Sequence, residues 1–281
     1  MTPLRFALLG DPVAHSKSPV MHSAAFRALH LPHRYDAIRC REDELGGYVD
    51  ALRRGELAGL NVTVPHKRAI LRHADLIDDR ARLAGAANTL ALRSGKVVAS
   101  NTDIGAITQE LRRLAPELHG GHAIVLGGGG AARSAIVACC SDLRMARIDV
   151  RVRAPSAEHA ADLVRVAGAA KLTLSSLTPN AEYERDTFVI VQATSAGMTG
   201  ADPGEPIAAA VAWSSLPPRA IALDVVYAPP DTPFTIAARE HGIRVSSGLG
   251  MLAWQGALAL ELWLGIPAPF DAMLSALLPT R

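Results

Sequence analysis

Short apolar runs alternate along this chain with segments whose apolar residues recur at helical spacing. Runs of strand length predict strands at residues 6–9, 61–64, 124–126, 148–152, 188–191 and 220–225. Helices are predicted at 104–114, 131–140 and 249–264. Another is expected to begin with Ser18 as N-cap and Pro19 in the first helical position. Such alternation is typical of an α/β protein with parallel sheets covered by helices.

The length and the punctuation of the chain predict more than one domain. At roughly 150 residues per domain, 281 residues amount to about two. Polar residues 101–103 precede one predicted helix, and Pro116 and a pair of glycines follow it. We therefore place an N-terminal α/β domain at residues 1–104, a dinucleotide-binding domain at 105–240, and C-terminal helices at 241–281.

Composition and charge exclude several classes of protein. The formal net charge of +2 lacks the basic excess of a dedicated nucleic-acid binder. Hydrophobic residues make up 49% of the chain, too many for a disordered protein. Only 4% of the residues are aromatic, so we expect an aliphatic core. The longest uncharged stretch, 245–260, is interrupted by Ser, Gly and Gln and does not predict a membrane span.

The cysteines and the start of the chain favour the cytoplasm. Cys40, Cys139 and Cys140 have neither the spacing of a disulfide framework nor a CxxC pair that would hold zinc. A reducing compartment therefore fits best. The first apolar run is too short for a signal peptide. The histidines show no spacing of the metal-site type either, so we expect no metal.

A glycine-rich turn follows the run at 124–126 and opens a helix. Residues Gly127 to Gly130 and then Ala131-Ala132 fit G-x-G-x-x-A, the relaxed dinucleotide-binding pattern. Glycine allows the backbone to approach a pyrophosphate, whose charge is favourable at a helix N-terminus. Because the turn lies between a strand and a helix, nucleotide binding is favoured over a purely structural turn.

The residue after the next strand indicates which nucleotide is bound. A carboxylate there would accept from the free 2′-hydroxyl of NAD, whereas Arg suits the 2′-phosphate of NADP. This chain has Arg153, and Arg151 is expected on the same face of the strand. The sequence favours NADP, while solvated edge residues remain the alternative.

Eight motifs, taken together, resemble those of the shikimate dehydrogenase family across essentially the whole chain. They are SKSP from Ser16, NVTVPHK from Asn61, GAANT from Gly85, NTD from Asn101, the glycine turn, QATSAGM from Gln192, DVVY from Asp224 and GLGMLAWQ from Gly248. The resemblance implies NADPH-dependent reduction of 3-dehydroshikimate to shikimate, on the route to aromatic amino acids. It also implies a substrate-binding N-terminal domain, a Rossmann-like cofactor domain, and C-terminal helices that return to the first domain.

The same resemblance implies roles for individual residues. Lys67 and Asp103 are the expected catalytic pair. The expected substrate-binding residues are Ser16, Ser18, Asn61, Thr63, Lys67, Asn88, Asp103, Tyr227 and Gln255. The expected cofactor-binding residues are Asp79, Gly127, Gly128, Gly129, Gly130, Ala131, Arg153, Thr194, Val225, Gly248 and Met251. A Lys ammonium suits this chemistry because hydride transfer to a ketone leaves an alkoxide that needs a proton and a nearby positive charge.

Three departures from the family pattern keep alternatives open. The usual Asn-Arg-Thr segment is Val152-Arg153-Ala154, and Ala157 stands where a basic residue is common. Gln192 replaces a frequent Asn, and Ile104 a frequent Gly. One alternative is therefore a quinate/shikimate or aminoshikimate dehydrogenase that also uses NAD. A second is a non-catalytic nicotinamide-nucleotide sensor. We expect small-molecule ligands, no nucleic acid, no membrane, and a monomer or homodimer.

Overall fold

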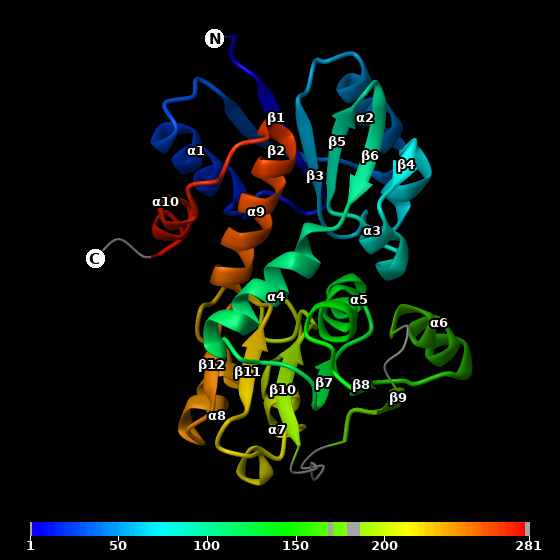
Figure 1. The fold of residues 1–281 in the computed structure, drawn as a ribbon, viewed down its shortest axis with the longest axis vertical. Coiled ribbons are helices and arrows are strands. Elements are labelled where there is room, and N and C mark those ends of the chain that lie inside the picture. Colours follow the sequence, from blue (N-terminus) through cyan, green and yellow to red (C-terminus); the bar gives the residue numbers. More distant parts are fainter. Residues whose placement is uncertain (1, 168–170, 179–185, 279–281) are drawn as a thin grey trace. The chain divides into compact units, whose positions relative to one another are not determined.

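The computed structural model describes residues 2–167, 171–178 and 186–278. The chain forms two compact units, one of Met1–Ala106 with Leu252–Arg281 and the other of Ile107–Met251 (Figure 1). The second unit therefore extends beyond residue 240, because β12 (Arg244–Ser246) pairs with β11 (Ile221–Asp224) of the same unit. The end of the chain returns to the first unit.

The first unit contains a mixed sheet in the order β2-β1-β3-β5-β6-β4. Its strands are β1 (Arg5–Gly10), β2 (Arg34–Arg39), β3 (Gly59–Val62), β4 (Leu76–Ile77), β5 (Thr89–Arg93) and β6 (Lys96–Ser100). The expectation of parallel strands fails for β5, which is antiparallel to both β3 and β6. The antiparallel pairing of β5 with β6 has a local reason: Ser94 and Gly95 both adopt positive φ and join the two strands as a tight hairpin.

Helices of the first unit are α1 (Ser18–Ala28), α2 (Leu45–Arg53), α3 (Asp79–Ala84) and α10 (Phe270–Ser275), with short 3₁₀ turns at Glu42–Glu44 and Ala69–His73. Two longer helices run through the division between the units, namely α4 (Thr102–Leu114) and α9 (Gly248–Leu264). Helix α1 corrects a prediction, because Lys17 is its N-cap and Ser18 is its first residue. The Ser18 N–H instead donates to Ser16 Oγ at 3.2 Å.

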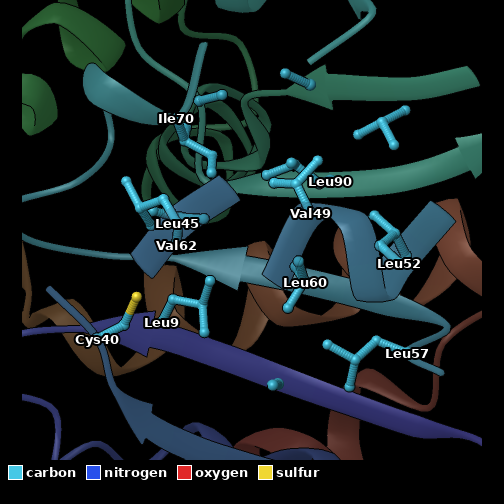
Figure 2. Packing of buried hydrophobic residues seen from close by; sticks show 14 of the residues in the cluster. Leu9, Cys40, Leu45, Val49, Leu52, Leu57, Leu60, Val62, Ile70 and Leu90 are labelled. Carbon is cyan, nitrogen blue, oxygen red and sulfur yellow. The ribbon is translucent and has the colours of Figure 1, made fainter. Parts of the chain in front are cut away.

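Apolar side chains fill the space between α2 and the first sheet. Leu45, Val49 and Leu52 of α2 are fully buried against Leu60 and Leu90 of the sheet (Figure 2). This cluster is aliphatic, as the composition predicts. Four aromatic residues of this unit, Phe6, Phe26, Tyr35 and Trp263, form a separate cluster around His22.

The second unit contains a parallel sheet in the order β12-β11-β10-β7-β8-β9. Its remaining strands are β7 (His122–Leu126), β8 (Arg147–Val152), β9 (Lys171–Ser176) and β10 (Thr187–Gln192). Its helices are α5 (Gly130–Val137), α6 (Ala157–Ala167), α7 (Glu205–Ala209) and α8 (Pro233–Glu240), with a π turn at Ala138–Asp142 and a 3₁₀ turn at Trp213–Ser215. This is the doubly wound Rossmann order, in which ligands bind beyond the carboxyl ends of the strands, where the order reverses between β7 and β10.

The predicted strands are found with shifted ends. The run at 61–64 belongs to β3, but this strand already ends at Val62, so Thr63 and Val64 lie in the following turn. Conversely, β7 and β8 begin before the predicted residues. Among the described residues, no helix is long and apolar enough to cross a membrane.

Candidate functional site

Lys67 and Asp103 form an ion pair in the first unit. Lys67 Nζ donates to Asp103 Oδ2 at 2.6 Å, and the two side chains are 19% and 5% exposed. Lys67 lies in the turn after β3, and Asp103 is the second residue of α4. The pair therefore combines a buried carboxylate with an ammonium group that is partly open to solvent, an arrangement suited to delivering a proton to a bound ligand.

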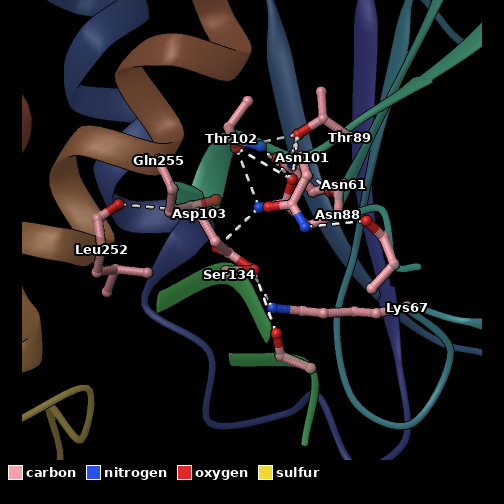
Figure 3. A network of polar contacts seen from close by, with 12 residues as sticks. Asn61, Lys67, Asn88, Thr89, Asn101, Thr102, Asp103, Ser134, Leu252 and Gln255 are labelled. Carbon is pink, nitrogen blue, oxygen red and sulfur yellow. Dashed lines mark hydrogen bonds and ion pairs between the residues drawn. The ribbon is translucent and has the colours of Figure 1, made fainter. Parts of the chain in front are cut away.

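A buried amide fixes the other oxygen of this carboxylate. Asn88 Nδ2 donates to Asp103 Oδ1 at 2.8 Å and to Thr102 Oγ1 at 3.0 Å. Asn88 Oδ1 accepts the Thr102 backbone N–H at 2.8 Å. Both ends of the amide thus hold the first turn of α4, and Asp103 cannot rotate without breaking a hydrogen bond (Figure 3). Asn88 is itself only 2% exposed, so this orientation is fixed by packing as well.

The network continues to Asn61, which is expected to bind substrate. Asn61 Nδ2 donates to the Asn88 carbonyl and to Thr89 Oγ1, both at 3.0 Å. Its Oδ1 accepts from the Tyr35 hydroxyl at 2.7 Å. Because these protein partners occupy both amide hydrogens and the carbonyl, the geometry supports a framework role for Asn61. Burial raises the pKa of Tyr35, so its hydroxyl remains a donor.

The remaining first-unit residues of the expected substrate site differ in environment. Ser16 and Thr63 are half-buried, whereas Ser18 is 4% exposed. Thr63 lies against Gly10 of β1, and its backbone N–H donates to the Leu9 carbonyl at 2.8 Å. Gln255 is half-buried on α9, and its Nε2 donates to the Leu252 carbonyl at 2.9 Å. Its amide oxygen has no such partner among the described residues, so it remains available to a hydroxyl.

Two of the expected site residues lie in the other unit than most residues of their group: one substrate residue is in the second unit, and one cofactor residue is in the first. Tyr227, expected near the substrate, follows β11 in the second unit and is half-buried, which raises the pKa of its hydroxyl. Asp79, expected near the cofactor, is exposed at the start of α3 in the first unit. Its neighbour Asp78 caps that helix by accepting from the Ala81 N–H at 2.7 Å.

The glycine turn joins β7 to α5, as predicted. Gly127 has a φ of +115°, and a Cβ there would lie 2.9 Å from Thr194 Cγ2 and 3.0 Å from the Ala193 carbonyl oxygen. Only glycine fits this position. Gly129, the N-cap of α5, is exposed and would meet nothing within 4 Å. Gly130 and Ala131 begin the helix, so an open path leads to free backbone N–H groups, where a pyrophosphate fits.

The two arginines near the end of β8 have different surroundings. Arg151 lies within the strand and is 7% exposed. Arg153 follows the strand, its side chain is 84% exposed, and its Nη1 lies 3.0 Å from Asp202 Oδ2. Of the two, Arg153 is therefore the side chain that can meet a phosphate.

Gln192, a departure from the family pattern, organises the turn after β10. Its Oε1 accepts the Thr194 N–H at 2.5 Å, and its Nε2 donates to the Ala196 carbonyl at 3.1 Å. The side chain is fully buried. The longer amide thus fills its site and fixes Thr194, which in turn contacts Gly127.

Asp224 organises the neighbouring turn, although we did not predict a role for it. Its Oδ1 accepts the Val226 N–H at 2.9 Å and its Oδ2 accepts from Thr232 Oγ1 at 2.5 Å. Burial raises the pKa of this carboxyl to about 6, against the opposing effect of both hydrogen bonds. The Val225 carbonyl packs directly on Gly248, whose N–H donates to the Val226 carbonyl at 2.9 Å. Val225 and Gly248, both expected at the cofactor, therefore lie together.

Met251, the last expected cofactor residue, is 8% exposed in the first turns of α9. Within the described ranges, no group of three or more His, Cys, Asp or Glu side chains is placed to hold a metal ion. A signal for the structural roles of Asp224 and Gln192 was present in the sequence: each ends a strand and is the first residue of one of the motifs. Tyr35 carried no such signal, because its partner Asn61 is 26 residues away.

Comparison with known proteins matches both ends of the chain to one family. Residues 8–90 match the model of the shikimate dehydrogenase substrate-binding domain, and residues 248–278 match that of the shikimate 5′-dehydrogenase C-terminal domain. A curated relative from Nitrosopumilus maritimus, shikimate dehydrogenase (NADP(+)), is 36% identical over 275 residues, 97% of each chain.

Solved structures agree over nearly the whole length. Shikimate 5-dehydrogenase from Thermus thermophilus, in complex with NADP(H) and shikimate, superposes with a TM-score of 0.82 at 35% identity and covers 98% of both chains. Ligand-free 5-ketofructose reductase of a Gluconobacter strain gives 0.87 at 28% identity and covers 99% of this chain and 98% of its own. With the ion pair, the glycine turn and matches of this extent in place, the chain belongs to the shikimate dehydrogenase family.

Proposed function

We propose that this protein is an NADP-dependent shikimate dehydrogenase, which reversibly reduces 3-dehydroshikimate to shikimate in the biosynthesis of aromatic amino acids. The observation that carries the proposal is the Lys67–Asp103 pair, in which Lys67 Nζ lies 2.6 Å from Asp103 Oδ2. The second carboxylate oxygen of Asp103 accepts a hydrogen bond from Asn88. A paired acid of this kind is what ketone reduction requires from the protein. The family relationship supports the same reaction.

Each group in the pair has a distinct part in the proposed reaction. When bound, NADPH supplies the hydride. Lys67 donates a proton from Nζ to the developing alkoxide and stabilises its charge. Asp103, held by Asn88, orients the ammonium group. In the oxidative direction Lys67 accepts the proton from the substrate hydroxyl. Ser16 and Ser18 are proposed to hold the substrate carboxylate, and Gln255 and Thr63 its hydroxyl groups.

The second unit fits NADP in the shape of its glycine turn. The backbone at Gly127 leaves no room for a side chain, while Gly129 is open on its outer side. Arg153 presents a guanidinium group next to the second strand, where this fold reads the ribose. We propose that Thr194, Val225, Gly248 and Met251 line the nicotinamide end.

Initial rates decide between the candidate reactions. The wild-type protein is assayed with shikimate and with quinate, each against NADP and NAD, and with 5-ketofructose against NADPH. We expect the highest kcat/KM for shikimate with NADP. Faster turnover of quinate or of 5-ketofructose would reassign the substrate, and the latter is a specific alternative because of the structural neighbour with that activity. No turnover of any pair would favour the nucleotide sensor.

We further propose that the protein acts in the cytoplasm as a monomer or homodimer. All three cysteines are free, and Cys40 and Cys139 are buried, which suits a reducing compartment. Cell fractionation and light scattering on the purified protein test these two statements. Recovery in a membrane or extracytoplasmic fraction, or a mass above that of a dimer, would contradict them.

A further inference from the structure

The segment that follows β8 presents a single arginine to a phosphate. Arg153 is already paired with Asp202 at 3.0 Å, and both side chains are largely exposed, at 84% and 64%. Ala154 and Ala157, which follow in this segment, carry no hydrogen-bonding group on their side chains. An ester phosphate carries close to two negative charges. Arg153, with a competing carboxylate beside it, is therefore a weak reader of such a group by itself.

One side chain of α6 lies against the glycine turn. A Cβ built on Gly128 would overlap Cε1 of His159 and would lie 2.6 Å from its Nε2. The same Cβ would lie 3.2 Å from Cγ1 of Val152, the residue directly before Arg153. The imidazole ring and the end of β8 thus meet at one glycine. This is the ribose end of the nucleotide site, because the residue after the second strand reads the ribose in this fold.

Two contacts fix α6 in this position. The His159 backbone N–H donates to Ser156 Oγ at 3.1 Å, which caps the first turn of the helix. One turn later, Asp162 pairs with Arg133 of α5, the helix that begins at the glycine turn. Because α6 is anchored on both sides of His159, the place of the ring beside Gly128 follows from the fold.

The ring is free to bind a ligand. Within residues 2–167, 171–178 and 186–278, neither ring nitrogen of His159 takes part in a hydrogen bond or an ion pair, and the residue is half-buried. An imidazole donates an N–H to phosphate in both its neutral and its charged form. The side chain therefore has donor capacity that no described residue uses.

We propose that His159 donates a hydrogen bond to the 2′-phosphate of NADP and, with Arg153, makes this chain prefer NADP over NAD. His159 is thus a specificity-determining residue that compensates for the two alanines after Arg153. The inference rests on the proposed use of NADP, and it adds a residue that the motifs of the resemblance do not name.

Binding of nucleotide fragments tests the role without any turnover. The full-length protein is titrated calorimetrically with adenosine 2′,5′-bisphosphate and with 5′-AMP, which differ only in the 2′-phosphate. His159→Phe keeps an aromatic ring on Gly128 but removes the donor. We expect it to weaken bisphosphate binding about 3- to 10-fold, the range of one hydrogen bond to a charged group, and to leave 5′-AMP binding within twofold. His159→Lys should restore bisphosphate binding.

The outcomes separate this inference from the proposed function. Equal weakening of both nucleotides by His159→Phe, or no weakening of either, would overturn the role of His159. So would equal binding of the two nucleotides by the wild type. His119→Phe, an exposed histidine before β7, is the matched control and should change neither affinity. The proposed function itself is tested by the rates of turnover of shikimate and its competitors, which these titrations do not measure.

Discussion

The proposed catalytic pair of the first unit and the proposed phosphate-binding pair of the second unit differ in how far their charged groups are exposed to water. Lys67 and Asp103 are 19% and 5% exposed and are held by a network of buried amides and hydroxyls. Arg153 and Asp202 form a pair at a comparable distance, but their side chains are 84% and 64% exposed. Burial strengthens and orients an ion pair, whereas water screens an exposed one. Proton transfer needs fixed geometry, and recognition of a phosphate at the surface needs only accessible donors.

The largest expected effect comes from removing the Lys67 ammonium group, which is paired with the buried Asp103 carboxylate. Lys67→Ala should lower kcat by about two to four orders of magnitude with little change in KM, because general acid catalysis contributes that much. Steady-state rates with shikimate and NADP measure it. Lys96→Ala, an exposed lysine at the start of β6 in the same unit, is the control. A variant of Lys67 with near-normal kcat would remove this residue from catalysis.

The framework around the pair should matter next, through stability. Asn88→Ala would leave Asp103 Oδ1 and the Thr102 N–H without their amide partner in a buried site. We expect the free energy of unfolding to fall by about 2–4 kcal/mol, measured by urea denaturation. The exposed Ser94, in the β5–β6 turn, provides a contrast: Ser94→Asn, which suits positive φ, should change it far less. A loss below about 0.5 kcal/mol for Asn88→Ala would show that the network does not fix Asp103.

Burial of the Asp224 carboxyl in the second unit should make the stability of the fold depend on pH. The folded protein raises the pKa of Asp224 to about 6, above its unfolded value near 3.9. Proton binding therefore stabilises the fold below pH 4, and this contribution is lost as the pH rises through 6. The Asp224→Asn variant cannot lose this stabilisation, because its side-chain amide does not titrate. The free energy of unfolding of this variant, relative to wild type, should rise by about 2 kcal/mol between pH 4 and pH 7.5.

Urea denaturation across that pH range measures the difference. Asp231→Asn, an exposed carboxylate seven residues later that pairs with Arg239, is the matched control and should show a much smaller change. A difference for Asp224→Asn that does not vary with pH would mean that the carboxyl stays charged in the fold, held by Val226 and Thr232.

The smallest effect is expected at the exposed pair. Asp202→Asn removes the carboxylate that competes for Arg153. Affinity for adenosine 2′,5′-bisphosphate should rise by no more than about fivefold, because exposed ion pairs contribute little. Binding of 5′-AMP should stay constant, and added salt should reduce the gain. A tenfold gain in affinity, or weaker binding of the bisphosphate, would contradict the small contribution expected of an exposed ion pair.

Motif and spacing predicted much of this molecule. The family resemblance, the α/β class and the glycine turn between β7 and α5 are confirmed. The predictions that failed concern the residue at which a helix begins and the direction of one strand. Helix α1 begins one residue earlier than predicted, with Lys17 as its N-cap and the Ser18 N–H donating to Ser16 Oγ. The first sheet is mixed because a two-residue turn reverses β5 into β6. The roles assigned to single residues in binding stay predictions.

Sequence by itself determined which chemical groups are present, in which order, and on which kind of element. Lys67, Asp103 and the glycines could be named from motifs because turn and helix-start positions depend on adjacent residues. Tertiary structure alone decided the environment of each group. It placed Asn88 on Asp103, Asp202 beside Arg153, and His159 on Gly128. These partners are 15 to 49 residues apart along the chain, and no local pattern encodes burial or distance between segments that meet only on folding.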